Sequence, residues 1–241
     1  VTEIPKSYLR HIFANDRNVR EDYLMHLLDH FDLELDLNLF RPVNTIHGKF
    51  VVYPEKTNPK LMQIIGYLIG DGHIGKRTIR FKDPDLDNLK EYKSLIKEAF
   101  NVSGKIAKLP DAEAYLLEVN SNFLVSWLRQ NFPGIQSHKR LLEEWIGHLP
   151  QKEIAAFLRG LYDAEGSVNL KSRQILISMC DREVIKVAQS LFLRLGILAS
   201  FNRLKPSTKQ IRESYSLTLS NDEQIKRYYS TVGFTSHKKD G

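Results

Sequence analysis

The sequence has 241 residues, with 35 Lys and Arg, 29 Asp and Glu, and a formal net charge of +6. Hydrophobic residues make up 42% of the chain, enough for one large folded domain or two smaller ones. No apolar run approaches ~18 residues, which argues against a membrane span. The single cysteine, Cys180, excludes an internal disulfide and argues against a cysteine-based zinc site. We expect a protein inside the cell, cytoplasmic or organellar, with no membrane partner.

Residues 1–58 form a separate segment, which we interpret as a small helix and hairpin appendage. Two short helical patterns are followed by an alternation of leucines and mostly acidic residues over 33–39, which predicts a half-buried strand with an acidic outer face. The run 49–53 predicts its partner strand. Because an acidic face repels phosphates, we favour a packing or docking subdomain over a winged-helix module. The basic excess lies entirely in residues 59–241, where an anionic partner is expected.

The rest of the chain is an internal repeat. Residues 60–72 and 153–166 are both apolar helical patterns that end in a carboxylate and a glycine, and Asp71 aligns with Glu165 at an offset of 94 residues. Each pattern is followed by a hairpin, an amphipathic helix, a second hairpin and a helix. This order predicts an α+β fold of two pseudo-symmetric αββαββα halves, residues 59–150 and 151–241.

Alternation of polar and apolar residues predicts the individual elements. In the first hairpin of the first half, Thr78, Arg80 and Lys82 alternate with buried positions. The corresponding strand of the second half spans about 174–179. The remaining predicted helices span 85–100, 122–131, 181–195 and 221–231, and the remaining predicted strands span 105–108, 115–119, 201–205 and 215–219.

Small residues recur four apart in the two repeated helices, Gly66 and Gly70 in one and Gly160 and Ala164 in the other. This spacing lets two helix backbones approach closely, so two buried helices at a seam would explain the glycines. It would not explain Asp71 and Glu165, because carboxylates at helix C-termini face the negative end of the dipole. Two such acids held together need a cation between them or a shared proton. Oxygen ligands with open water positions favour Mg²⁺.

At these residues the sequence resembles the LAGLIDADG family of homing endonucleases. Residues 64–72 and 158–166 match the nine-residue motif of that family, with its acidic position in Asp71 and Glu165. Two motifs resemble the monomeric branch of the family. The resemblance covers about residues 60–236 and implies a central interface of two helices, with two antiparallel sheets that form a saddle over DNA.

The resemblance also implies an activity and its residues. The chain would bind a long asymmetric site on double-stranded DNA and hydrolyse one phosphodiester on each strand, leaving short 3′ overhangs. Asp71 and Glu165, with the backbone carbonyls of Gly70 and Ala164, would hold Mg²⁺, for which Mn²⁺ or Ca²⁺ can substitute in binding. Lys82, and Lys171 in the second half, are the catalytic lysine candidates. The residue aligned with Lys82 is expected near Met179–Cys180, and His73 is either a contact of the water network or a loop residue.

The outer strand faces are implied to lie along the major groove and to supply the remaining contacts. The predicted DNA-binding residues are Lys76, Arg77, Thr78, Arg80, Lys82, Gln174, Arg203, Lys205, Lys209, Arg212, Ser216 and Thr218.

Two other functions and three origins stay open at this point. An intron maturase would bind RNA on the same fold, and a DNA-binding regulator would need neither acid. The retention of both acids favours an enzyme. Self-splicing inteins begin with Cys or Ser and end in His-Asn, so this sequence, from Val1 to Gly241, is not expected to splice as written. A free-standing, an intron-encoded and an intein-derived endonuclease all remain compatible with it.

Overall fold

The computed structural model describes residues 29–31, 51–110, 112–135, 142–204 and 213–235. The chain divides into two compact units, Val1–Phe50 and Val51–Gly241. The fold below is that of the second unit, which contains both repeats. The strand predicted over 33–39 lies outside the described residues.

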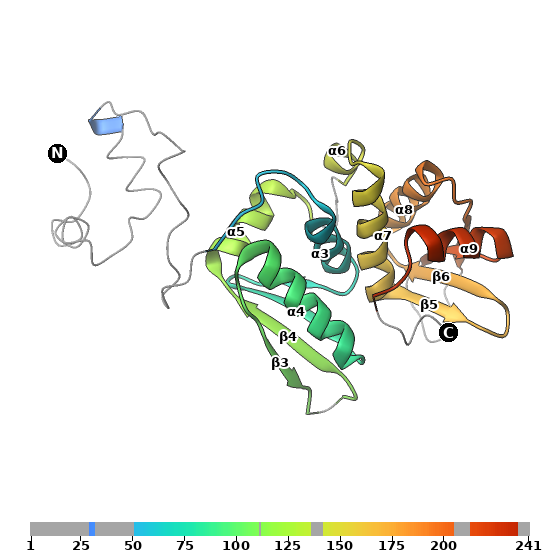
Figure 1. Cartoon of the computed structure of the whole chain (residues 1–241), viewed down its shortest axis with the longest axis horizontal. Coiled ribbons are helices and arrows are strands. Elements are labelled where there is room, and N and C mark those ends of the chain that lie inside the picture. Colours follow the sequence, from blue (N-terminus) through green and yellow to red (C-terminus); the bar gives the residue numbers. More distant parts are fainter. Residues whose placement is uncertain (1–28, 32–50, 111, 136–141, 205–212, 236–241) are drawn as a thin grey trace. The chain divides into compact units, whose positions relative to one another are not determined.

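The second unit contains the two predicted halves in tandem (Figure 1). The elements of the first half are α3 Pro59–Ile69, β1 His73–Ile74, β2 Thr78–Asp83, α4 Leu86–Phe100, β3 Lys105–Lys108, β4 Tyr115–Asn120 and α5 Asn122–Asn131. The elements of the second half are α7 Gln151–Glu165, β5 Gly166–Asn169, β6 Gln174–Met179, α8 Arg182–Arg194, β7 Ser200–Leu204, β8 Ser214–Leu219 and α9 Asp222–Thr231. A short helix that the sequence did not predict, α6 Leu142–Ile146, precedes α7.

Each half builds one antiparallel sheet of four strands, and the strand orders are equivalent. The order is β1-β2-β4-β3 in the first sheet and β5-β6-β8-β7 in the second. The predicted α+β class and the predicted repeat are therefore confirmed. Within the described residues, no helix is long and apolar enough to cross a membrane.

The helices α3 and α7 pack against each other along the seam between the halves (Figure 1). A Cβ atom added to Gly66 would lie 2.1 Å from the carbonyl oxygen of Phe157. A Cβ added to Gly160 would lie 2.0 Å from the carbonyl oxygen of Gln63. Both distances are far below van der Waals contact, so the two helices touch through their backbones and only glycine fits at the crossing.

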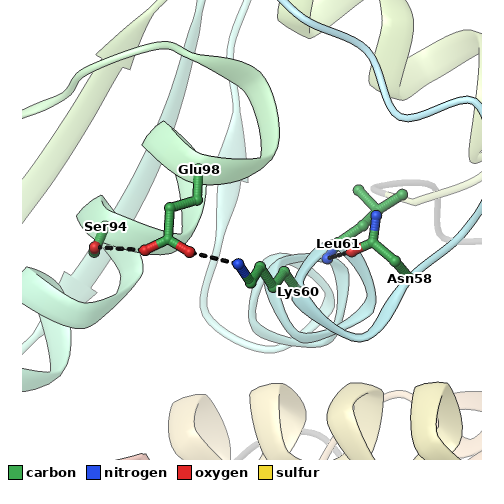
Figure 2. A network of polar contacts seen from close by, with 5 residues as sticks. All are labelled: Asn58, Lys60, Leu61, Ser94 and Glu98. Carbon is green, nitrogen blue, oxygen red and sulfur yellow. Dashed lines mark hydrogen bonds and ion pairs between the residues drawn. The ribbon is translucent and has the colours of Figure 1, made fainter.

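Polar contacts fix the start of α3 (Figure 2). Asn58 caps the helix, with its Oδ1 accepting from the backbone N–H of Leu61 at 3.0 Å. Lys60 Nζ donates to Glu98 of α4 at 2.6 Å, and Ser94 Oγ donates to the other oxygen of the same carboxylate at 3.1 Å. The first helix is therefore tied to α4 of its own half.

Hydrogen bonds around the buried Asp163 tie the two halves together beside α7. Asp163, 1% exposed, accepts from the Tyr92 hydroxyl of α4 at 2.7 Å and from the Thr235 N–H at 2.8 Å. Gln63 of α3 donates its Nε2 to Thr235 Oγ1 at 2.6 Å. Burial, followed by the Asp163 charge, raises the pKa of Tyr92, so its hydroxyl stays protonated and donates. Thr235 therefore bridges α3 and α7.

Residues 51–58 pack on the first half, which differs from the predicted boundary at residue 58. Val51 is 1% exposed, and Val52 donates its N–H to the Phe100 carbonyl at 2.9 Å. Tyr53 stacks on Trp127 of α5 with ring centroids 5.5 Å apart. Residues 51–53 are not in a strand, so the partner strand predicted over 49–53 is wrong over this part. The apolar side chains cover the end of α4 instead of pairing in a hairpin.

Two truncations test this boundary. Removal of residues 1–50 is expected to leave the second unit folded, because its core begins at Val51. Removal of residues 1–58 is expected to cost about 3 kcal/mol or more of unfolding free energy, from the buried valine, the stacked Tyr53 ring and the Asn58 cap. Urea unfolding of the two truncated proteins measures the difference. Equal stability of the two would contradict the boundary at Val51.

Candidate functional site

The two repeated helices end at one place. A Cβ atom added to Gly70, the residue that caps α3, would lie 2.6 Å from Ala164 Cβ and 3.1 Å from Glu165 Cγ. The Gly70 backbone therefore lies directly against the side chain of Glu165, and Asp71 is the next residue. Asp71 is exposed and Glu165 is half-buried, so both acids can be reached from solvent.

The donor atoms at this place fit a hard divalent cation. The carbonyl ends of both helices carry the negative end of the dipole, and two carboxylates are added to them. Within the described residues, no group of three or more His, Cys, Asp or Glu side chains is arranged to hold a metal ion by itself. A cation held by Asp71, Glu165 and the carbonyls of Gly70 and Ala164 would thus have only oxygen ligands and would keep several waters. Mg²⁺ prefers such a set, whereas zinc sites use nitrogen and sulfur.

Lys82 lies on the outer face of β2, whose partner strand β1 begins two residues after the first acid, Asp71. β1 and β2 pair with His73 opposite Arg80. The Tyr67 hydroxyl of α3 donates to the Lys82 carbonyl oxygen at 3.0 Å, which fixes this end of β2 against the helix. Lys82 is exposed. The catalytic role of Lys82 beside Asp71 stays a prediction.

The second half lacks a lysine at the equivalent place. Ser167 is opposite Leu176 as His73 is opposite Arg80, so Leu176 corresponds to Arg80 and, two residues further along the strand, Ser178 corresponds to Lys82. The position expected near Met179–Cys180 is therefore wrong by one or two residues. Lys171 lies in the turn at the far end of β5 from Glu165. The structure does not bring Lys171 to the acids.

The outer face of the first sheet carries the predicted alternation. Thr78, Arg80 and Lys82 lie on this face, while Ile79 and Phe81 are fully buried. Lys76 and Arg77 are exposed in the turn before β2. Strand pairing adds a cross-strand row that the sequence analysis did not identify, which we call the charged row: His73, Arg80, Glu118 and Lys105. The charged row can be recognised only from the pairing of β2 with β4 and of β4 with β3, which are far apart in the sequence.

The outer face of the second sheet is neutral. Three predicted residues lie on this face: Gln174, Ser216 and Thr218. Ser216 is only 6% exposed. The row equivalent to the charged row, which we call the neutral row, consists of Ser167, Leu176, Thr218 and Ser200.

Arg203 lies on the inner face of the second sheet. Arg203 is opposite Tyr215 and shares the face of Phe201, which is the face toward the helices. Its guanidinium is paired with Glu213, and hydrogen bonding to Arg203 lowers the pKa of that carboxyl. The contact of Arg203 with DNA stays a prediction. Lys205, Lys209 and Arg212 lie outside the described residues.

A comparison with protein families matches residues 152–233 to the LAGLIDADG-like domain. In a comparison with solved structures, the chain is similar to the homing endonuclease I-DmoI. For I-DmoI in complex with DNA and Mn, the TM-score is 0.54 and the identity 21%, covering 74% of this chain and 98% of that one. At this identity the likeness shows the shared fold.

Among curated proteins, the chain is similar to segments of much longer ones. It is 34% identical to glutamine–fructose-6-phosphate aminotransferase of Methanocaldococcus jannaschii, over 92% of this chain and 20% of that protein. It is 25% identical to the replication factor C small subunit of the same organism, over 79% of this chain and 10% of that protein. The chain thus spans a fifth or less of the length of these relatives.

Proposed function

Because this chain belongs to the LAGLIDADG family, we propose that it is a site-specific endonuclease that cuts both strands of a DNA duplex with the help of divalent cations. One observation carries the proposal. The backbone contact of Gly70 with Ala164 and Glu165 brings two acidic helix ends, one from each half, to a single point. A duplex has one scissile phosphate on each strand, and two pseudo-symmetric halves supply one acid for each.

The DNA would lie on the outer faces of the two sheets. These faces carry basic side chains in the first sheet and hydrogen-bonding side chains in both, as groove contacts require. The acids directly precede the first strand of each sheet, since Asp71 comes two residues before β1 and Glu165 one residue before β5. A duplex bound there would bring its phosphates to the acids.

The residues of the chain have separate tasks in cleavage. Asp71 and Glu165 would hold the cations, and the carbonyls of Gly70 and Ala164 would complete the protein ligands. When bound, a divalent cation supplies activation of water and stabilisation of the charge that develops on the phosphate and on the leaving 3′ oxygen. Cuts at the two strands across the narrowed minor groove would leave short 3′ overhangs. The protein would act as a monomer, because it already contains both halves.

Lys82 would orient the attacking water and offset the phosphate charge. Replacement of Lys82 by alanine is expected to slow the single-turnover rate of cleavage by about 10²-fold or more, the range of a positioned proton-transfer or charge-stabilising group. DNA affinity should fall by only a few-fold, because one phosphate contact among many is lost. Quenched-flow cleavage and filter binding measure the two effects separately.

Lys105→Ala is the matched control for Lys82→Ala. Lys105 is an exposed lysine on the same outer face, two strands away from Lys82, so its loss should weaken binding without changing the single-turnover rate. If both variants lose affinity only, Lys82 is a phosphate contact and has no part in the chemical step.

The function itself is tested with a randomised library of DNA duplexes. The full chain and Mg²⁺ are incubated with the library, and the cut ends are sequenced. We expect one long asymmetric consensus with staggered ends, and the addition of EDTA should abolish cutting. Binding without any cut in Mg²⁺ or Mn²⁺ would instead support the regulator on the same fold. Retention of both acids at the contact of α3 and α7 favours the nuclease.

The similarity to segments of longer proteins favours an intein-derived endonuclease over a free-standing or an intron-encoded one. The matching segments lie in an aminotransferase and in a replication factor subunit, which share no function by name. A segment shared by such different hosts is a module that moves independently of them. We therefore propose that this chain is an intein-derived endonuclease rather than an intron-encoded protein, and that double-stranded DNA rather than intron RNA is its partner.

A further inference from the structure

The two outer faces differ in charge although their backbones are equivalent. The charged row, His73, Arg80, Glu118 and Lys105, corresponds strand by strand to the neutral row, Ser167, Leu176, Thr218 and Ser200. An acid on a surface that would face DNA is unexpected, because it repels phosphates. Glu118 is the residue that needs explanation.

The carboxylate of Glu118 holds two neighbours on the outer face. Arg80 donates its Nε to Glu118 Oε2 at 2.7 Å, and Asn120 donates its Nδ2 to Oε1 at 3.2 Å. Within the described part of the chain, Nη1 and Nη2 of Arg80 have no hydrogen bond or ion pair. Both oxygens of the carboxylate therefore accept from side chains of the same face, and the terminal edge of the guanidinium is left for another acceptor.

The free edge of Arg80 matches one base. Two parallel N–H groups fit O6 and N7 of guanine in the major groove, which is the commonest specific contact of arginine with DNA. An unheld arginine side chain loses rotamer entropy when it becomes ordered, and a hydrogen bond to Nε removes part of this cost before DNA binds. Leu176, which replaces Arg80 in the neutral row, has no donor and suits apolar contact with a thymine methyl.

We propose that Glu118 is a positioning residue that orients Arg80 toward a guanine in one half of the target, and that the other half has no such guanine requirement. This inference rests on the proposed binding of DNA. The inference goes beyond DNA binding, because it assigns a guanine to the charged row and predicts that the two half-sites differ at the base pairs that the charged row and the neutral row contact. Asn120, held by the same carboxylate, would contact the neighbouring base step.

The test uses the full chain, Ca²⁺ and a randomised duplex library, from which bound DNA is selected and sequenced. We expect the wild-type protein to prefer guanine at one position by about 5- to 150-fold over the other bases, which is the discrimination of a bidentate pair. Arg80→Ala should remove this preference. Glu118→Gln should reduce it at the same position, while affinity for unrelated DNA stays equal or rises, because a negative charge is removed from the DNA-facing surface.

Glu98→Gln is the matched control for Glu118→Gln. Glu98 also forms an exposed ion pair, with Lys60 at 2.6 Å, but it lies on helix α4. Its replacement should leave the base preference unchanged. An unchanged guanine preference in Glu118→Gln, or a change at a position other than the one lost in Arg80→Ala, would overturn the inference. If the wild-type protein selects no DNA at all, the proposed function fails instead.

Discussion

Asp71→Asn and Glu165→Gln are each expected to abolish double-strand cleavage, with a loss of at least about 10³-fold in rate, while DNA binding persists. Each substitution keeps the shape of the side chain and removes one negative charge from the cation ligands. With a weakened cation, neither the attacking water nor the leaving oxygen is stabilised on that strand. Single-turnover cleavage of a labelled duplex in Mg²⁺ measures the rate, and a shift assay in Ca²⁺ measures the binding.

The two single variants should differ in what remains of cleavage. If each acid serves one strand, either variant could retain slow nicking of the opposite strand, and strand-specific end labels would show which one. Asp87→Asn is the control, because Asp87 is an exposed acid whose side chain is 81% accessible on helix α4. Metal-dependent cutting of both strands by the double variant Asp71→Asn, Glu165→Gln would show that the acids are not the cation ligands.

The double variant Asp71→Asn, Glu165→Gln should also lose binding of the cation. Titration of the wild-type protein with Mn²⁺ in the presence of DNA should show saturable binding that the double variant lacks. Retained Mn²⁺ binding by the double variant would place the cation at other residues.

The repeat could be predicted from the sequence because both halves repeat the same local patterns. Alternation of polar and apolar residues in β2 and β6 predicted which side chains lie on the outer faces. The small residues Gly66 and Gly160 predicted the contact of the two helices. These are local signals, since period and residue size are set within a few positions of the chain. The fold class and the position of both acids follow from them.

The sequence does not reveal strand register, and the missed features depend on it. Opposite residues of the first hairpin are seven positions apart in one half, His73 and Arg80, and nine apart in the other, Ser167 and Leu176, so the offset of 94 residues becomes 96 beyond the turn. For this reason the equivalent of Lys82 is Ser178. Likewise, only the pairing of β7 with β8 shows that Arg203 faces the helices, and only the pairing of β2 with β4 brings Glu118 to Arg80.

The second large effect is expected at the crossing of α3 and α7. Alanine in place of glycine inside a helix normally stabilises it by up to about 1 kcal/mol. Here Gly66→Ala and Gly160→Ala should each destabilise the protein by at least about 3 kcal/mol, because the new Cβ would lie about 2 Å from a backbone oxygen of the facing helix. A backbone atom cannot turn aside as a side chain can, so the helices would have to separate.

Separation of the helices would also move the acids apart, and this links stability to activity. The crossing at Gly66 and the contact at Gly70 lie on one face of α3, one helical turn apart. Cleavage by Gly160→Ala should therefore fall even at a temperature where the variant is folded, whereas Lys152→Ala, at an exposed position of the same helix, should change unfolding free energy by less than about 0.5 kcal/mol and leave cleavage intact. Urea unfolding and single-turnover cleavage of both variants at one temperature make the comparison. A glycine variant as stable as the wild-type protein would mean that the two backbones do not touch, and the shared position of Asp71 and Glu165 would lose its physical basis.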